Sequence, residues 1–140
     1  MNISINRERI FKEIQTVLAK SLAIGTDEIE LKSRLIDDLG ADSLDLLDLI
    51  FTLEKKFALK LRDADLDRLM RADFADETKD GYIPVKDVER LTEWLPALRS
   101  APDPSKILPQ TLFSYVTVES LLILIERKLS GKIPANGGKQ

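Results

Sequence analysis

Ser43 is the residue of this 140-residue chain that is best placed to do chemistry. It follows Asp42 and opens an apolar stretch that we predict to be a helix over residues 42–57. A serine at a helix N-terminus presents its hydroxyl outward, and the unpaired backbone N–H groups and the positive end of the helix dipole favour a phosphodiester there. Gly40 and Ala41 add little side-chain bulk beside it. The pattern therefore indicates a serine that a modifying enzyme can approach closely.

The first turn of this predicted helix should be capped by its own side chains. Asp42 has the short carboxylate of an N-cap residue, and Asp45 falls three residues on, as in a capping box. An isolated Asp-Ser-Leu is more often a simple helix cap than a modification site, because short motifs recur by chance. The context favours modification, since the motif follows a predicted helix and loop in a chain that lacks other catalytic apparatus.

The run from Asp37 to Asp45, Asp-Asp-Leu-Gly-Ala-Asp-Ser-Leu-Asp, resembles the phosphopantetheine attachment signature of the acyl carrier protein family. The resemblance covers residues 7–58 closely and residues 114–129 more loosely, but not the middle of the chain. It implies an all-α fold, an acyl-carrier-type four-helix bundle with an additional helical insertion. It also implies that Ser43 carries a 4'-phosphopantetheine arm, taken from coenzyme A, on which acyl groups are held as thioesters.

On this resemblance the chain is a carrier without catalytic activity of its own, and Asp42 and Leu44 complete the cofactor-binding motif around Ser43. A phosphopantetheinyl transferase would load the arm. Acyl-processing enzymes such as a ketosynthase, a dehydratase or an acyltransferase would then act on the acyl group. The pathway stays open between fatty acids, lipid A or another special lipid, and a polyketide-like product.

The predicted second helix should also present a face to partner enzymes. Its carboxylates would steer and orient a basic partner surface, and Leu44, Leu47 and Phe51, at three- and four-residue steps, would make contact. The alternative is that these three side chains belong to the core. The candidate partner-binding residues are Asp45, Leu47, Asp48, Phe51 and Glu54. Lys55 and Lys56 depart from the more continuously acidic helix of fatty acid synthesis carriers, which weakens an assignment to those general enzymes.

The composition excludes several other classes of function. The chain has no cysteine and no histidine, which removes disulfides, zinc sites built on these residues and His-assisted nucleophilic catalysis. Its net charge of -3 gives no basic footprint for nucleic acid. No stretch approaches the roughly 20 apolar residues of a membrane span, and the N-terminus lacks the apolar core of a secretory signal. We therefore expect a cytoplasmic protein without a transmembrane segment. We also expect a monomer.

Apolar spacing predicts three core helices, over about residues 6–23, 42–57 and 117–130. We expect them to form a single acyl carrier domain over residues 1–130. Residues 131–140 contain three glycines and a proline and are expected to be a flexible tail.

The middle of the chain, about residues 60–115, is expected to be the insertion. Residues 63–74 and 84–98 are predicted to be helical, and they would pair as a hairpin that enlarges an acyl pocket or adds a partner surface. Plain structural elaboration is the alternative. Prolines between residues 100 and 110 predict a linker or an ordered loop.

Residues 76–87 fit much of the template of a calcium-binding loop. Asp and Gly occupy the fifth and sixth positions, but Thr stands at the third position and Asp, rather than the longer Glu, at the twelfth. The chain contains no second calcium-binding loop that could pair with this one. A tight turn is the competing interpretation. The candidate ligands are Asp76, Thr78, Asp80, Tyr82 and Asp87.

Two other functions follow from these alternatives. One is a helical adaptor with a calcium-binding loop, in which Asp42 and Ser43 only cap a helix. The other is a peptidyl carrier domain of nonribosomal synthesis, which shares the attachment serine. The acidic residue immediately before Ser43 favours acyl over peptidyl carriage.

Overall fold

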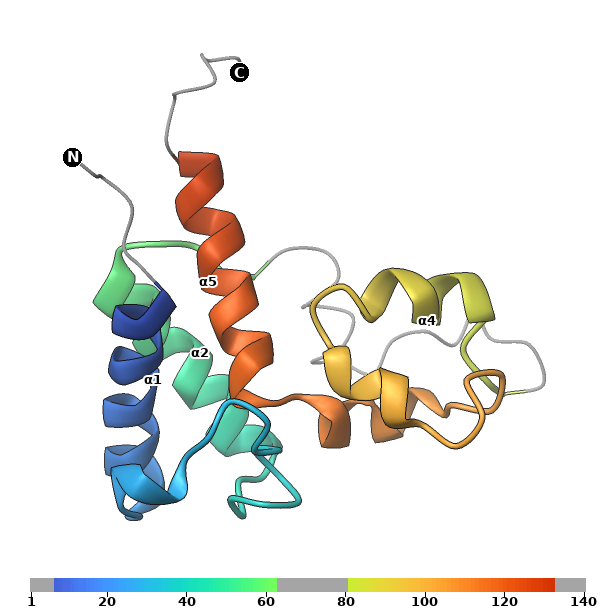
Figure 1. The fold of residues 1–140 in the computed structure, drawn as a ribbon, viewed down its shortest axis with the longest axis horizontal. Helices are drawn as coiled ribbons and strands as arrows, with labels where there is room; N and C mark the ends of the chain where they lie inside the picture. The colour runs from blue at the N-terminus through green and yellow to red at the C-terminus, as the bar shows by residue number, and fades with distance from the viewer. Residues whose placement is uncertain (1–6, 63–80, 133–140) are drawn as a thin grey trace.

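The computed structural model describes residues 7–62 and 81–132 of the chain (Figure 1). Within these residues no strand forms, and β pairing is limited to isolated bridges such as the antiparallel one between Arg34 and Thr117. The remaining regular structure is helical, which confirms the all-α prediction. The α-helices are α1 (Arg7–Leu22), α2 (Ser43–Phe57), α4 (Val85–Leu91) and α5 (Val118–Lys132).

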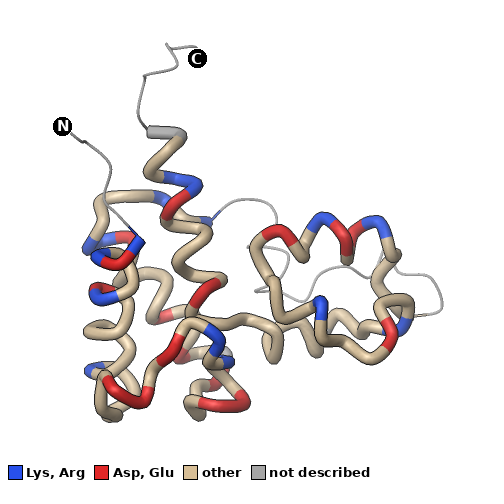
Figure 2. Tube along the Cα trace, viewed as in Figure 1, with Lys and Arg blue, Asp and Glu red and all other residues tan. Residues whose placement is uncertain are grey.

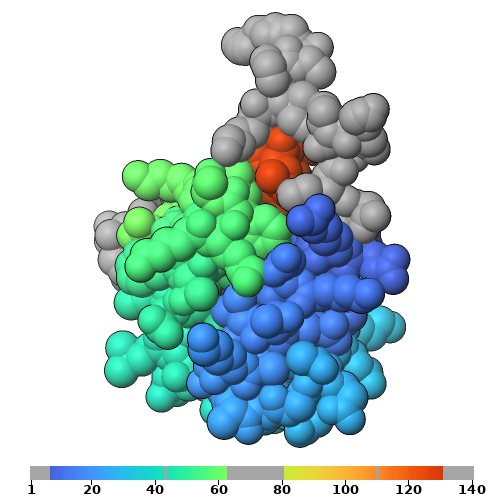
Figure 3. All heavy atoms as spheres, turned by 90° about the vertical axis from the view of Figure 1, so that its left-hand side faces the viewer, coloured from blue at the N-terminus to red at the C-terminus, as the bar shows by residue number. Residues whose placement is uncertain are grey.

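Helices α1, α2 and α5 form the bundle, in which α1 packs against both of the others (Figures 1 and 3). Each helix turns an apolar stripe inward, because side chains three and four residues apart share one face. The fully buried members of these stripes include Ile10, Ile14, Leu18, Leu49, Ile50, Leu53, Leu122 and Ile125. The predictions of helices over residues 6–23 and 42–57 are therefore confirmed.

The last helix starts where the sequence predicts and ends later. The buried hydroxyl of Thr117 accepts a hydrogen bond from the backbone N–H of Ser120 at 3.2 Å, which caps the first turn. Helix α5 continues to Lys132 and so takes in the beginning of the predicted tail. The rest of that tail, residues 133–140, lies outside the described residues.

The prediction of one continuous helix over residues 84–98 is wrong. Helix α4 ends at Leu91, and a separate 3-10 helix, η3 (Pro96–Ser100), follows a turn. Proline has no N–H to donate and its ring clashes with the carbonyl four residues back, while the residue before a proline is pushed out of the α conformation. Leu95 accordingly adopts φ -120° and ψ 69°. Pro96 thus divides the predicted helix.

The described part of the middle of the chain, residues 81–116, is called the middle segment below. Its stretch after residue 100 is an ordered loop, in which buried Ile107 accepts a hydrogen bond from the backbone N–H of Ile83 at 2.9 Å. A further 3-10 helix, η4 (Pro109–Tyr115), leads into α5. The predicted helix over residues 63–74, and with it the proposed hairpin, lies outside the described residues.

The middle segment shares a core with the bundle. Its largest buried side chain is that of Trp94, and the same apolar cluster contains the buried residues of α1, α2 and α5. Arg127 of α5 also reaches Glu93 at 3.4 Å. The middle segment is therefore packed onto the bundle by apolar contact.

The loop between α1 and α2 is hydrogen-bonded to the start of α5. The backbone N–H of Leu35 donates to the carbonyl of Val116 at 3.0 Å, and those of Val118 and Glu119 donate to carbonyls of the loop at 3.0 and 2.9 Å. These bonds fix the loop that leads directly into α2.

Candidate attachment site

Ser43 is the first residue of α2, and the helix start is fixed by a reciprocal cap. The backbone N–H of Asp45 donates to Oδ1 of Asp42 at 2.8 Å, and the backbone N–H of Asp42 donates to Oδ2 of Asp45 at 3.0 Å. The predicted capping box is confirmed. Two of the unpaired N–H groups at this end are thereby satisfied, and the backbone on either side of Ser43 is held in place.

The two residues before Asp42 differ in their surroundings, because one is held against the core and the other borders open space. Ala41 is buried, and its backbone N–H donates to the carbonyl of Leu35 at 2.9 Å. Gly40 adopts φ +78°, a left-handed conformation that glycine reaches without strain, and a Cβ there would meet no atom within 4 Å. The glycine is therefore needed for its backbone angle, and the space beside it is free.

The outward face of α2 carries most of the predicted partner residues. Leu44 is 74% exposed and Phe51 is 38% exposed, while Leu47 is half-buried and Asp48 is exposed. Leu44, Leu47 and Phe51 follow one another at three- and four-residue steps, so they share a face of the helix. The structure thus brings these residues together on a face of α2 that is separate from its buried apolar stripe.

Glu54 is placed differently from the other predicted partner residues. Its carboxylate accepts hydrogen bonds from the backbone N–H groups of Leu61 at 2.9 Å and Arg62 at 3.3 Å, and from Nε of Arg62 at 3.3 Å. The Glu54 side chain is only 12% exposed. Glu54 therefore fixes the backbone of Leu61 and Arg62, which follow the end of α2.

Arg62 is a residue of this face that the sequence analysis missed. Its guanidinium lies 4.6 Å from the centroid of the Phe51 ring, within the range of a cation–π interaction. The helix ends at Phe57, and Ala58 takes a left-handed conformation with φ 53°, so helical periodicity carries no signal for a residue beyond it.

Charge is distributed unevenly along this part of the molecule. Acidic residues gather on the loop before α2 and on its first turns, whereas its last turn is basic (Figure 2). Lys56 pairs with Glu13 of α1 at 3.2 Å. The acidic residues nearest to Ser43 in the chain are Asp37, Asp38, Asp42, Asp45 and Asp48.

Comparison with known proteins identifies this arrangement. Residues 12–71 match the family model described as phosphopantetheine attachment site. The acyl carrier protein of Thermotoga maritima is 41% identical over 64 residues, which are 46% of this chain and 79% of that protein. The chain belongs to the acyl carrier protein family. Its cofactor is accordingly 4'-phosphopantetheine, attached covalently.

Other acyl carrier proteins match over the same length. That of Campylobacter jejuni subsp. doylei is 41% identical over 61 residues, covering 44% of this chain and 79% of the relative. That of Campylobacter hominis is 36% identical over 61 residues, covering 44% of this chain and 77% of the relative. No solved structure matches the chain. The family model spans most of α1, the loop and all of α2, and so contains the capped helix start.

The residues at the start of α2 fit an attached phosphate-linked arm. The exposed Leu44 and Asp42, and the open space at Gly40, leave room for a group joined to the first residue of the helix. The N-terminus of a helix also favours a negatively charged group.

The calcium-loop hypothesis gains no support from the described part of the loop. Asp76, Thr78 and Asp80 lie outside the described residues. Tyr82 is half-buried, and Asp87 is buried in the first turn of α4, where it pairs with Arg90 at 3.2 Å. Within the described ranges, no cluster of acidic side chains is arranged to hold a metal ion. No helix in those ranges has the length and apolar run of a membrane span.

Proposed function

We propose that Ser43 is the attachment residue of this acyl carrier protein, with Asp42 and Leu44 as its neighbours in the cofactor-binding motif. The observation that carries the proposal is its position as the first residue of α2, beside a reciprocal cap and inside the segment that matches the attachment family. The Ser43 oxygen forms a phosphodiester with phosphopantetheine from coenzyme A, and adenosine 3',5'-bisphosphate leaves. The chain then carries acyl groups as thioesters and leaves their chemistry to other enzymes.

The partners of this carrier are a phosphopantetheinyl transferase and acyl-processing enzymes such as a ketosynthase, a dehydratase or an acyltransferase. Leu44, Leu47 and Phe51 form the apolar contact, and Asp45 and Asp48 present carboxylates to a basic partner surface. Charge at the edge of such a contact sets the orientation and the association rate more than the affinity. Glu54 acts indirectly, because it positions Arg62 over Phe51.

The carrier domain spans residues 1–130 and acts as a monomer. About residues 60–115 form an insertion within it. The apolar cluster that joins the middle segment to the bundle supports a single domain that includes both. Loading requires coenzyme A, which favours a cytoplasmic carrier. The acyl group belongs to fatty acid, special-lipid or polyketide-like synthesis, and the basic last turn of α2 favours a dedicated set of enzymes.

Intact-protein mass spectrometry tests the attachment directly. The full chain is incubated with coenzyme A and a broad-specificity phosphopantetheinyl transferase, alongside Ser43→Ala and the matched control Ser21→Ala, which changes an exposed serine of α1. We expect a gain of one phosphopantetheine in the parent and in Ser21→Ala, and none in Ser43→Ala. No gain with several transferases would leave a helical interaction module in which Ser43 only begins a helix.

A further inference from the structure

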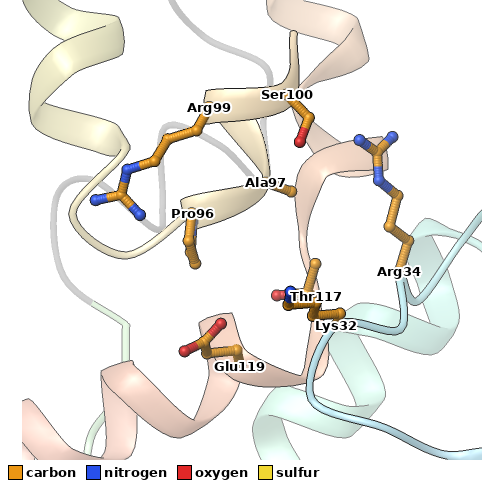
Figure 4. A pocket seen from close by; sticks show the side chains of 8 residues that line it. All are labelled: Lys32, Arg34, Pro96, Ala97, Arg99, Ser100, Thr117 and Glu119. Atoms are coloured by element: carbon orange, nitrogen blue, oxygen red, sulfur yellow. The ribbon is translucent and has the colours of Figure 1, made fainter.

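A cleft of about 330 Å³ lies between the middle segment and the bundle (Figure 4). Helix η3 forms one wall, and the loop before α2 and the start of α5 form the other. This volume is at the lower end of the range of small-ligand pockets, about 300–1,000 Å³. The lining residues are Lys32, Arg34, Pro96, Ala97, Arg99, Ser100, Thr117 and Glu119.

The cleft carries excess positive charge. Three of its lining side chains are cationic and one, Glu119, is anionic. Glu119 is also paired with Arg7 at 3.6 Å, and Arg34 with Asp37 at 3.3 Å, so the excess charge comes from Lys32 and Arg99. Within the described residues, neither Lys32 nor Arg99 has an ion pair. The cleft therefore favours a ligand with a negative charge.

Arg34 is the most firmly positioned of the three cations. Its guanidinium lies 4.8 Å from the centroid of the Tyr115 ring, and its Nη1 is 3.3 Å from a carboxylate oxygen of Asp37. In Figure 4 the Arg34 side chain rises on one side of the cleft to the level of Ser100, which adds a hydroxyl, while the Arg99 side chain extends away from it on the opposite side. A guanidinium held in this way loses little conformational entropy when it binds a carboxylate.

The backbone at the start of α5 does not supply the binding groups. The N–H groups of Val118 and Glu119 donate to loop carbonyls, and the hydroxyl of Thr117 is engaged with Ser120. Side chains from the loop and η3 must therefore hold the anion, with Pro96 and Ala97 as the apolar wall.

The distance from Ser43 to Arg34 is comparable with the length of an arm attached to Ser43. The chain from Ser43 back to Ala41, and the hydrogen bond from Ala41 to Leu35, keep the Cα atoms of Ser43 and Arg34 within about 20 Å. An extended phosphopantetheine arm has as many chain atoms as about five peptide residues, which span up to roughly 17 Å. An acyl group of a few carbons lengthens the arm to about the same distance.

We propose that this cleft binds the free carboxylate of an acyl group carried on the arm, so that the protein retains acyl groups that end in a carboxylate. Lys32 and Arg34 hold the carboxylate, Arg99 adds positive charge on the other side of the cleft, Ser100 donates a hydrogen bond, and the methylene groups contact Pro96 and Ala97. The inference rests on the proposed attachment at Ser43 and names the class of acyl group.

The test compares two acyl groups of equal carbon number. The ¹⁵N-labelled full chain is loaded from glutaryl-coenzyme A or from pentanoyl-coenzyme A, and intact mass confirms each product before ¹H–¹⁵N spectra are recorded. We expect the amide signals of Arg34, Ala97 and Ser100 to shift in the glutaryl form relative to the pentanoyl form. The double variant Lys32→Gln/Arg99→Gln should lose that difference. The control Lys12→Gln/Lys20→Gln removes the same charge from exposed positions of α1 and should keep it.

The outcomes separate the two proposals. If loading succeeds and the two acyl forms give the same cleft signals, or if Lys32→Gln/Arg99→Gln keeps the difference, this inference is wrong while the attachment at Ser43 stands. A failure to load from coenzyme A itself, with several transferases, overturns the attachment and the inference with it. A saturable shift with inorganic phosphate on the unloaded protein, without a glutaryl-specific shift, would assign the cleft to a free anion instead.

Discussion

Asp42 and Asp45 cap each other across the first turn of α2, each carboxylate accepting the backbone N–H of the other residue, at 2.8 and 3.0 Å. Ser43 lies between them in the chain. The cap places two negative charges at the positive end of the helix, where they are stabilising. It therefore serves both the stability of α2 and the position of the residue that we propose to be modified.

Asp42→Ala should lower the free energy of unfolding by about 1 kcal/mol, because the first turn loses its N-cap acceptor. Urea denaturation followed by circular dichroism measures the change. Asp48→Ala removes an exposed carboxylate of the same helix that takes no part in the cap, and it should stay within about 0.5 kcal/mol of the parent. Equal effects of the two substitutions would contradict the assigned role of the cap.

Glu54→Ala should destabilise the protein by about 1–3 kcal/mol, because the N–H of Leu61 would lose its acceptor in a partly buried place. Glu54→Gln keeps an acceptor oxygen and should cost less. The same urea titrations apply, with Glu89→Ala, an exposed carboxylate of α4, as the control. If Glu54→Ala were as mild as Glu89→Ala, Glu54 would be a partner residue rather than a structural one.

The bundle helices and the attachment motif are the parts that the sequence could predict. Ile10, Ile14 and Leu18 recur at the helical period because one face of α1 is buried, and a buried face leaves a periodic trace. The cap of α2 is equally local, since its two aspartates are three residues apart. Such signals come from neighbours in the chain.

The other parts depend on contacts that have no period in sequence. The cleft brings Lys32 and Arg34 together with Arg99 and Ser100, which are far apart in the chain and belong to no common pattern. The break before Pro96 was readable from the proline itself, but the apolar spacing on either side of it continues and suggested an unbroken helix. Helical spacing alone therefore overstates continuity where a 3-10 turn keeps the same side chains buried.

Trp94 offers a test of whether the middle segment and the bundle form one domain. It is the only tryptophan of the chain and is 1% exposed within the shared core. We expect its fluorescence and the far-UV circular dichroism to change at the same urea concentration, since a single cooperative unit gives coincident transitions. A fluorescence transition at clearly lower urea would show that the middle segment unfolds separately, against the proposed domain.

Trp94→Phe should be much milder than Trp94→Ala. The indole nitrogen is the one buried side-chain polar atom without a hydrogen-bond partner among the described residues, so phenylalanine removes an unsatisfied donor and keeps most of the ring. We expect a loss below about 1.5 kcal/mol for Phe and about 3–5 kcal/mol for Ala, which leaves a cavity. Circular dichroism in urea measures both variants. Similar large losses would mean that the indole nitrogen has a bonding role.

Ser105→Ala should raise the pKa of Asp103. The Ser105 hydroxyl, at 2.6 Å, and the Ser105 backbone N–H, at 3.0 Å, donate to the same Asp103 oxygen and hold the pKa of that carboxyl below its ordinary value. A carboxyl whose pKa is lowered by folding stabilises the native state above its ordinary pKa of about 3.9, and this stabilisation is lost as the pH falls through the lowered value. The difference in Tm between parent and variant should therefore be present at pH 7 and disappear in acid. Carboxyl ¹³C titration measures the pKa directly, and Ser114→Ala, whose hydroxyl donates to the carbonyl of Thr111, should leave it unchanged.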